Sequence, residues 1–157
     1  MTGAPEPRID PDVDLGQPDD RSVPPGPTAV LLAVIAAGGV LGALARAGAQ
    51  AAAPNAATGF AWATFGVNVL GCLLIGVLMV LVERCRANPL LRPFLGVGVL
   101  GGFTSFSAYV LDVHRAAQAG AFGVAGGYLV ATVLGALAAV WLGDVTTNAL
   151  LDRRAAR

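Results

Sequence analysis

The hydrophobic positions of this chain gather into four long apolar stretches, at residues 28–49, 60–82, 91–112 and 121–143. Each is close to the roughly twenty residues that a helix needs to cross a hydrocarbon core of about 30 Å. The second and the fourth stretch contain no charged residue. Short connectors separate the four stretches, so the pattern predicts an all-α membrane protein of four transmembrane helices.

The third stretch is the least regular of the four. It has glycines at positions 96, 98, 101 and 102, followed by the hydroxyl-rich run Phe103-Thr104-Ser105-Phe106-Ser107. Because each glycine weakens a helix by about 1 kcal/mol relative to alanine, this helix is predicted to break at mid-membrane. Irregular backbone in lipid is tolerated only where it is buried in protein or lines a cavity. The alternative is an unbroken packing face whose hydroxyls bond back to the preceding turn.

The two ends of the chain differ from its centre. Residues 1–27 hold seven Pro and six acidic residues, with almost no large apolar groups. Such a segment buries too little surface to offset the entropy of ordering, which predicts a disordered tail. Residues 144–157 are predicted to form a short C-terminal tail. Residues 28–143 are therefore expected to be a single transmembrane domain, with no room for a soluble catalytic domain.

Composition supports a lipid environment and argues against catalysis. The 157 residues are 55% hydrophobic and only 13% charged, whereas a soluble domain carries about 25% charged residues. The formal net charge of zero gives no indication of a nucleic-acid partner. His114 is the single histidine, and no pair of buried carboxylates is evident. Cys72 and Cys85 are interpreted as packing residues. Because no other catalytic group is evident in the chain, neither an enzyme nor an organic cofactor is expected.

The distribution of arginine predicts an orientation. Near the helix ends, seven arginines lie on the side shared by the N-terminus, the second connector and the C-terminus, against two on the other side. Cytoplasmic loops carry the excess of positive charge, so both termini are predicted to lie in the cytoplasm, beneath a bacterial-type plasma (inner) membrane. Arg46, at the end of the first stretch, can snorkel to the interface or occupy a water-filled vestibule.

Two polar stripes run through the apolar stretches. Asn68 is the only side-chain amide within them, and Thr64 lies one turn earlier on the same helix face. Asn68 is either a helix–helix contact worth about 1 kcal/mol or a donor that lines a permeation path. Tyr128 and Thr132 form a second stripe at i, i+4, which ends at Ala136.

Three motifs carry a family resemblance. Residues 38–46 read GGVLGALAR, residues 64–76 read TFGVNVLGCLLIG and residues 101–109 read GGFTSFSAY. In this order and spacing they resemble the first-helix GGxxGAxxR, the second-helix pattern with its central Asn and the third-helix GGxTTFSTF of the CrcB family, the Fluc fluoride channels. The resemblance covers residues 28–143 and implies an antiparallel, dual-topology-type dimer with two fluoride pores and a sodium ion buried at the interface.

The resemblance also implies roles for individual residues. The backbone carbonyls of Gly101 and Thr104 would bind the sodium ion, a hard cation that oxygen ligands suit. Asn68 would donate a hydrogen bond to fluoride, with Thr64 alongside. The rest of the fluoride pathway would consist of aromatic rings and hydroxyl groups: Phe106, Ser107, Tyr109, Tyr128 and Thr132.

Two positions depart from the third-helix motif. Tyr109 stands where the family has the second Phe of its Phe box, whose ring edges attract a partly dehydrated anion. Its hydroxyl would either narrow the pore or alter the box in this subunit. Ser105 replaces the second Thr of the motif, which keeps the hydroxyl and is expected to be a mild change.

The resemblance implies a channel that passively exports fluoride from the cytoplasm and relieves fluoride toxicity. An alternative is a partner subunit with little activity alone, paired with an oppositely oriented paralogue, because the arginine bias favours one insertion and Tyr109 alters the box. A small multidrug-type exporter also has four spans in an antiparallel dimer, but it needs a buried carboxylate in its first helix. Residues 28–49 contain no Asp or Glu, which argues against an exporter.

Overall fold

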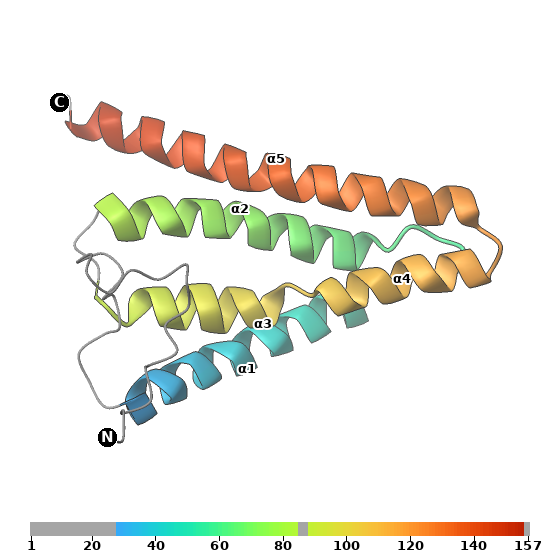
Figure 1. Cartoon of the computed structure of the whole chain (residues 1–157), viewed down its shortest axis with the longest axis horizontal. Coiled ribbons are helices and arrows are strands. Elements are labelled where there is room, and N and C mark those ends of the chain that lie inside the picture. The colour runs from blue at the N-terminus through green and yellow to red at the C-terminus, as the bar shows by residue number, and fades with distance from the viewer. Residues whose placement is uncertain (1–27, 85–87, 156–157) are drawn as a thin grey trace, which may run out of the picture.

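The computed structural model describes residues 28–84 and 88–155. The predicted disordered tail of residues 1–27 lies outside the described residues, as do Cys85 and the last two positions of the chain. The described part is helical, with short connections and no strand (Figure 1). Its elements in chain order are α1 Thr28–Ala52, α2 Trp62–Arg84, the π-helical segment η2 Arg92–Leu100, α3 Gly101–Phe103, α4 Phe106–Gln118 and α5 Phe122–Ala155.

Four helical stretches in the described residues are long and apolar enough to cross a membrane: Thr28–Ala52, Trp62–Arg84, Arg92–Gln118 and Phe122–Ala155. The prediction of an all-α chain with four membrane-length helices is thus confirmed. The start of α1 and the end of α5 lie at the same end of the bundle (Figure 1), as four consecutive antiparallel spans require.

The third span consists of η2, α3 and α4 in succession. Helical backbone ends at Phe103, and the next two residues are extended, Thr104 at φ −77° and ψ 154° and Ser105 at φ −151° and ψ 110°. The helix resumes at Phe106, where the Ser105 hydroxyl caps it by accepting from the Ala108 N–H at 3.1 Å. Gly101 is still helical, so the interruption follows the glycine pair.

Two spans run further than the apolar pattern indicates. The helix α5 has 34 residues, about 50 Å at 1.5 Å per residue, and continues through residues 144–155. The Thr147 hydroxyl donates to the Gly143 carbonyl at 2.7 Å, and Arg84 pairs with Asp152 and ties this extension to α2. The third span continues to Gln118 and stops at Gly120, whose φ of 76° gives it a left-handed conformation typical of a helix end.

Glycines allow the helices to approach closely. The helix α1 packs on η2 and α3, and α2 packs on α5. A Cβ at Gly98 would lie 2.7 Å from the carbonyl oxygen of Ile35, and a Cβ at Gly42 would overlap the carbonyl of Val99. Gly143 meets the carbonyl of Leu73 in the same way between α5 and α2. Close backbone packing of this kind holds helices together in lipid, where apolar burial provides no driving force.

Large apolar side chains face outward. Leu44, Trp62, Phe122 and Trp141 are each more than 60% exposed, whereas the buried core is small and centres on Ala61, Tyr109 and Tyr128. A soluble protein rarely exposes apolar surface so extensively. The arrangement fits a protein whose outer surface meets hydrocarbon.

Candidate functional site

Asn68 binds the interruption of the third span. Its Oδ1 accepts from the Ser105 N–H at 2.9 Å, and its Nδ2 donates to the Ser105 carbonyl at 3.3 Å. These bonds satisfy backbone groups that the extended residues release from the helix. Asn68 is 9% exposed, and the pair joins α2 to the third span. Its amide nitrogen carries two hydrogens, so one remains for another acceptor.

Gly101 and Thr104, the predicted sodium ligands, both lose the α-helical donor of their carbonyl group. The Ser105 N–H, which lies four residues after Gly101, donates to Asn68 instead. The Ala108 N–H, four residues after Thr104, donates to the Ser105 hydroxyl.

Both residues border one hollow, of about 190 Å³, between α2 and the third span. The Thr104 methyl reaches toward Gly71, where any Cβ would overlap it. Carbonyl oxygens without helical donors beside a hollow are suitable ligands for a hard cation, so these residues fit a sodium site.

A second hollow, of about 270 Å³, brings five of the predicted site residues together. It lies along the interruption, between α2, the third span and α5. Its predicted residues are Asn68, Thr104, Phe106, Tyr109 and Thr132, and Cys72 borders it as well. Cys72 also borders the hollow at Gly101 and Thr104, which the interpretation of this cysteine as a packing residue did not anticipate.

The rings of Phe106 and Tyr109 lie next to each other, with centroids 5.8 Å apart and planes tilted by 52°. Phe106 is 79% exposed and Tyr109 only 7%. The Tyr109 hydroxyl donates to the Leu129 carbonyl of α5 at 3.1 Å. The polar atom that distinguishes Tyr109 from Phe is therefore bound to the backbone of the neighbouring helix.

The second polar stripe lies beside this aromatic pair. Tyr128 is 2% exposed, and its ring centroid is 5.6 Å from that of Tyr109. Its hydroxyl lies near those of Thr64 and Thr132, but it forms no hydrogen bond of good geometry among the described residues. The Thr132 hydroxyl donates to the Tyr128 carbonyl at 2.8 Å. A buried hydroxyl without a partner costs about 1–3 kcal/mol, so Tyr128 offers a donor for a water molecule or a bound anion.

Arg46 and Ser107 are two more predicted residues that do not line this hollow. Arg46 extends from α1 and its Nε donates to the Gly102 carbonyl at 3.1 Å, so it contacts the third span just before the interruption. Ser107 is exposed, and its hydroxyl lies 3.3 Å from that of Ser105.

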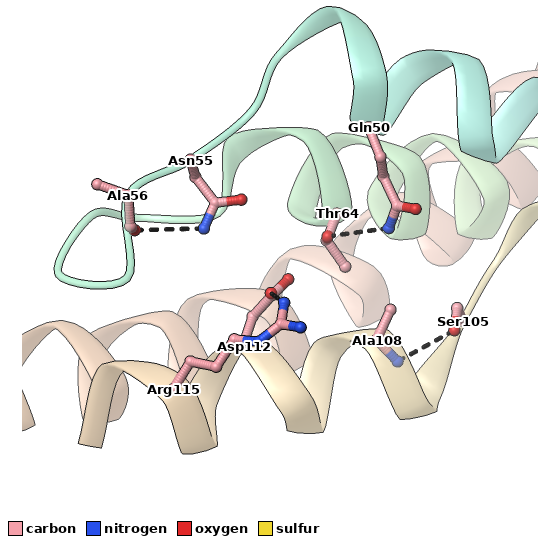
Figure 2. A network of polar contacts seen from close by, with 8 residues as sticks. All are labelled: Gln50, Asn55, Ala56, Thr64, Ser105, Ala108, Asp112 and Arg115. Carbon is pink, nitrogen blue, oxygen red and sulfur yellow. Dashed lines mark hydrogen bonds and ion pairs between the residues drawn. The ribbon is translucent and has the colours of Figure 1, made fainter. Parts of the chain in front are cut away.

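Sequence reasoning missed a polar group at one end of the bundle. Gln50, Asp112 and Arg115 lie with Thr64 around a third hollow of about 270 Å³ (Figure 2). The i, i+3 spacing of Asp112 and Arg115 was a visible signal. The contact between Gln50 and Thr64, at 3.3 Å between Nε2 and Oγ1, joins two helices, and no pattern in the sequence indicated it.

The fold and these hollows define a small multi-pass membrane protein with an interrupted third span and polar side chains at the interruption. The family model described as "CrcB-like protein, Camphor Resistance (CrcB)" matches residues 33–144. The chain belongs to the CrcB family, and the resemblance drawn from its three motifs is confirmed.

Relatives of the chain are named as fluoride channels. It is 55% identical over 128 residues to "Fluoride-specific ion channel FluC 2" of Thermobifida fusca, covering 81% of this chain and 95% of the relative. It is 50% identical over 127 residues to "Fluoride-specific ion channel FluC 1" of Streptomyces coelicolor, covering 80% and 82%. It is 54% identical over 122 residues to "Fluoride-specific ion channel FluC 2" of Nocardia farcinica, covering 77% and 86%. Ion channels are not enzymes, so these names confirm the expectation that this chain is not one.

Proposed function

We propose that this chain is a subunit of a fluoride-selective channel that passively releases fluoride from the cytoplasm and so relieves fluoride toxicity. The observation that carries the proposal is the hollow along the interrupted third span, where Asn68, Phe106, Tyr109 and Thr132 meet. Relatives 50% to 55% identical are named as fluoride-specific ion channels, which supports the same ion.

The chemistry of the hollow suits a small anion. Fluoride is strongly hydrated, so a selective pore has to replace its water with fixed donors. The second amide hydrogen of Asn68 is a donor at the hollow. The Tyr128 hydroxyl, which does not line the hollow but is buried next to Tyr109, is a second donor without a well-formed hydrogen bond. The positive edge of the Phe106 ring adds a weaker attraction. Thr64, Ser107 and Thr132 supply further hydroxyls along the proposed path.

The proposed assembly is an antiparallel dimer with the interruption at mid-membrane and a structural sodium ion at the interface. The carbonyls of Gly101 and Thr104, which lack their helical donors, would hold the ion. When bound, sodium would supply the positive charge that these exposed carbonyl dipoles require in lipid. Arg46 would keep a structural role beside them, through its bond to Gly102.

A second candidate is a partner subunit that conducts only with an oppositely oriented paralogue. The distribution of arginines supports this candidate. Four described arginines, Arg84, Arg92, Arg153 and Arg154, stand at helix ends on the side where α5 ends, against Arg46 and Arg115 on the other. Such a bias favours one insertion, with both termini in the cytoplasm beneath the plasma membrane.

The test is fluoride release from liposomes that contain the purified chain alone, followed with a fluoride electrode. Under the channel proposal, valinomycin triggers rapid fluoride release from vesicles that contain the protein. Protein-free vesicles release little fluoride, and vesicles loaded with chloride release little chloride, measured with a chloride electrode. If fluoride is released only when a paralogous chain is co-reconstituted, the result contradicts the single-chain channel and supports the partner-subunit function. Release that requires a proton gradient would contradict a passive channel and favour an exporter.

A further inference from the structure

The third hollow opens at the end of the bundle opposite to the end of α5. It lies where the end of α1, the connection to α2 and the helix α4 meet, and it has a volume of about 270 Å³. Its polar side chains are Gln50, Asn55, Thr64, Asp112 and Arg115. Of these, only Thr64 belongs to the proposed fluoride path, so the hollow adds residues that have no assigned role.

Every polar side chain of this hollow except Asp112 can donate a hydrogen bond. The Gln50 amide donates to the Thr64 hydroxyl oxygen at 3.3 Å. The Thr64 hydroxyl keeps its own hydrogen while it accepts from Gln50, because a hydroxyl that accepts through a lone pair still has its O–H. The Asn55 amide and the Arg115 guanidinium add further N–H groups. A lining with so many donors suits an anion.

Asp112 is the exception, and it is the deeper of the two charged groups. Its side chain is 10% exposed, against 59% for Arg115. The distance from Arg115 Nη1 to Asp112 Oδ1 is 3.7 Å. Figure 2 shows both side chains on α4, across the hollow from Gln50 and Thr64. The carboxylate thus acts as a fixed anion that neutralises Arg115, and the two leave the lining without formal charge.

We propose that this hollow is the mouth of the anion pathway, where Arg115 attracts hydrated fluoride and Asp112 limits that attraction. The inference rests on the proposed channel function. It adds that the charges of Arg115 and Asp112 set the rate at which fluoride enters the channel. A charged group in a concave, poorly hydrated mouth changes the local concentration of an ion and hence its entry rate by about tenfold or more. Removing Arg115 leaves a net negative mouth that repels fluoride, and removing Asp112 leaves a net positive one.

The experiment compares Arg115→Gln, Asp112→Asn and the double variant with the wild-type chain in proteoliposomes. Initial fluoride release is measured at ionic strengths of about 0.01 M and about 1 M, where the Debye length is about 30 Å and about 3 Å. Isethionate serves as the impermeant anion, and the fluoride and potassium gradients keep a fixed ratio. At low ionic strength we expect Arg115→Gln to lower the rate about tenfold and Asp112→Asn to raise it by a similar factor. The double variant stays near wild type, and all rates converge at high salt.

Two controls separate charge from folding. Arg115→Lys keeps the charge without the guanidinium, so its rate stays near wild type at both ionic strengths. Arg153→Gln removes an equal charge at the end of α5, at the opposite end of the same chain from this hollow, and leaves the rate unchanged. All variants are compared at equal amounts of protein that elutes as a single species in size-exclusion chromatography.

The outcomes distinguish the mouth from the channel. Wild-type release with unchanged rates in Asp112→Asn and Arg115→Gln at low ionic strength would overturn the mouth and leave the channel proposal intact. Equal losses in Arg115→Lys and Arg115→Gln, or losses that persist at high salt, would show that the pair acts only structurally, which also overturns it. No release from the wild-type chain would overturn the single-chain channel and the mouth together.

Discussion

The substitution Tyr109→Phe tests whether the departure from the family motif matters for conduction. It removes one oxygen atom, which donates to the Leu129 carbonyl at 3.1 Å. The ring keeps its place between Phe106 and Tyr128, 5.8 Å and 5.6 Å away between centroids. The Leu129 carbonyl keeps its helical donor because α5 is continuous through Val133. The loss is therefore the net value of one hydrogen bond, about 0.5–1.5 kcal/mol.

The expected result is a small loss of stability with conduction preserved. A loss of about 1 kcal/mol lowers the melting temperature of a chain of this size by about 2–4 °C, measurable by size-exclusion chromatography after heating in detergent. Fluoride release from liposomes should stay within about twofold of wild type, since the hydroxyl is bound to backbone. As a matched variant, Tyr109→Leu removes the ring and is expected to reduce release strongly, because the positive ring edge is lost.

One result would refute this reasoning. If Tyr109→Phe changed fluoride release by tenfold or more, about 1.4 kcal/mol in barrier height, at unchanged melting temperature, the hydroxyl would act on the ion. The bond to Leu129 would then not describe the conducting state. A large gain in release from the single chain would favour the partner-subunit function, since it would identify Tyr109 as the feature that limits conduction.

Three further predictions follow from individual contacts. Asn68→Ala removes both bonds to the interruption and is expected to abolish fluoride release and lower the melting temperature; wild-type release would show that the interruption holds without it. Gly42→Ala drives a methyl into the Val99 carbonyl and should reduce the folded yield in size-exclusion chromatography, whereas Gly48→Ala, whose Cβ meets nothing within 4 Å, should not. Ag⁺, a soft cation that thiolates bind well, should inhibit release through Cys72, and Cys72→Ala should be resistant; equal inhibition of both chains would place the reactive thiol elsewhere.

The four spans could be predicted from the sequence because lipid imposes one length on every crossing helix. The end of the last helix could not, since hydrophobicity marks where hydrocarbon ends and not where helical hydrogen bonding ends. Beyond residue 143 the backbone continues as a helix through Ala155. It is supported there by the Thr147 hydroxyl and the pair between Arg84 and Asp152, which join positions that a hydropathy pattern treats as separate.

The candidate site was predicted in part. The pattern of polar residues in apolar stretches identified Asn68 and Thr132, because a polar group in lipid requires a partner. It did not identify the partners. Asn68 binds Ser105, 37 residues away, and the Tyr109 hydroxyl binds a backbone carbonyl of α5, which no side chain in the sequence marks. Long-range contacts of this kind depend on how the helices pack, which periodicity does not encode.

The interruption connects the three sequence motifs into one hydrogen-bonded unit. Asn68, from the second motif, binds both backbone groups of Ser105, and Arg46, from the first, binds the Gly102 carbonyl. The bond from the Ser105 N–H to Asn68 Oδ1 diverts the donor that a regular helix would give to the Gly101 carbonyl, just as the Ser105 cap diverts the Ala108 N–H from the Thr104 carbonyl. Since carbonyl groups in a membrane require a partner, the contacts that stabilise the interruption also free the two carbonyls that would hold the proposed sodium ion.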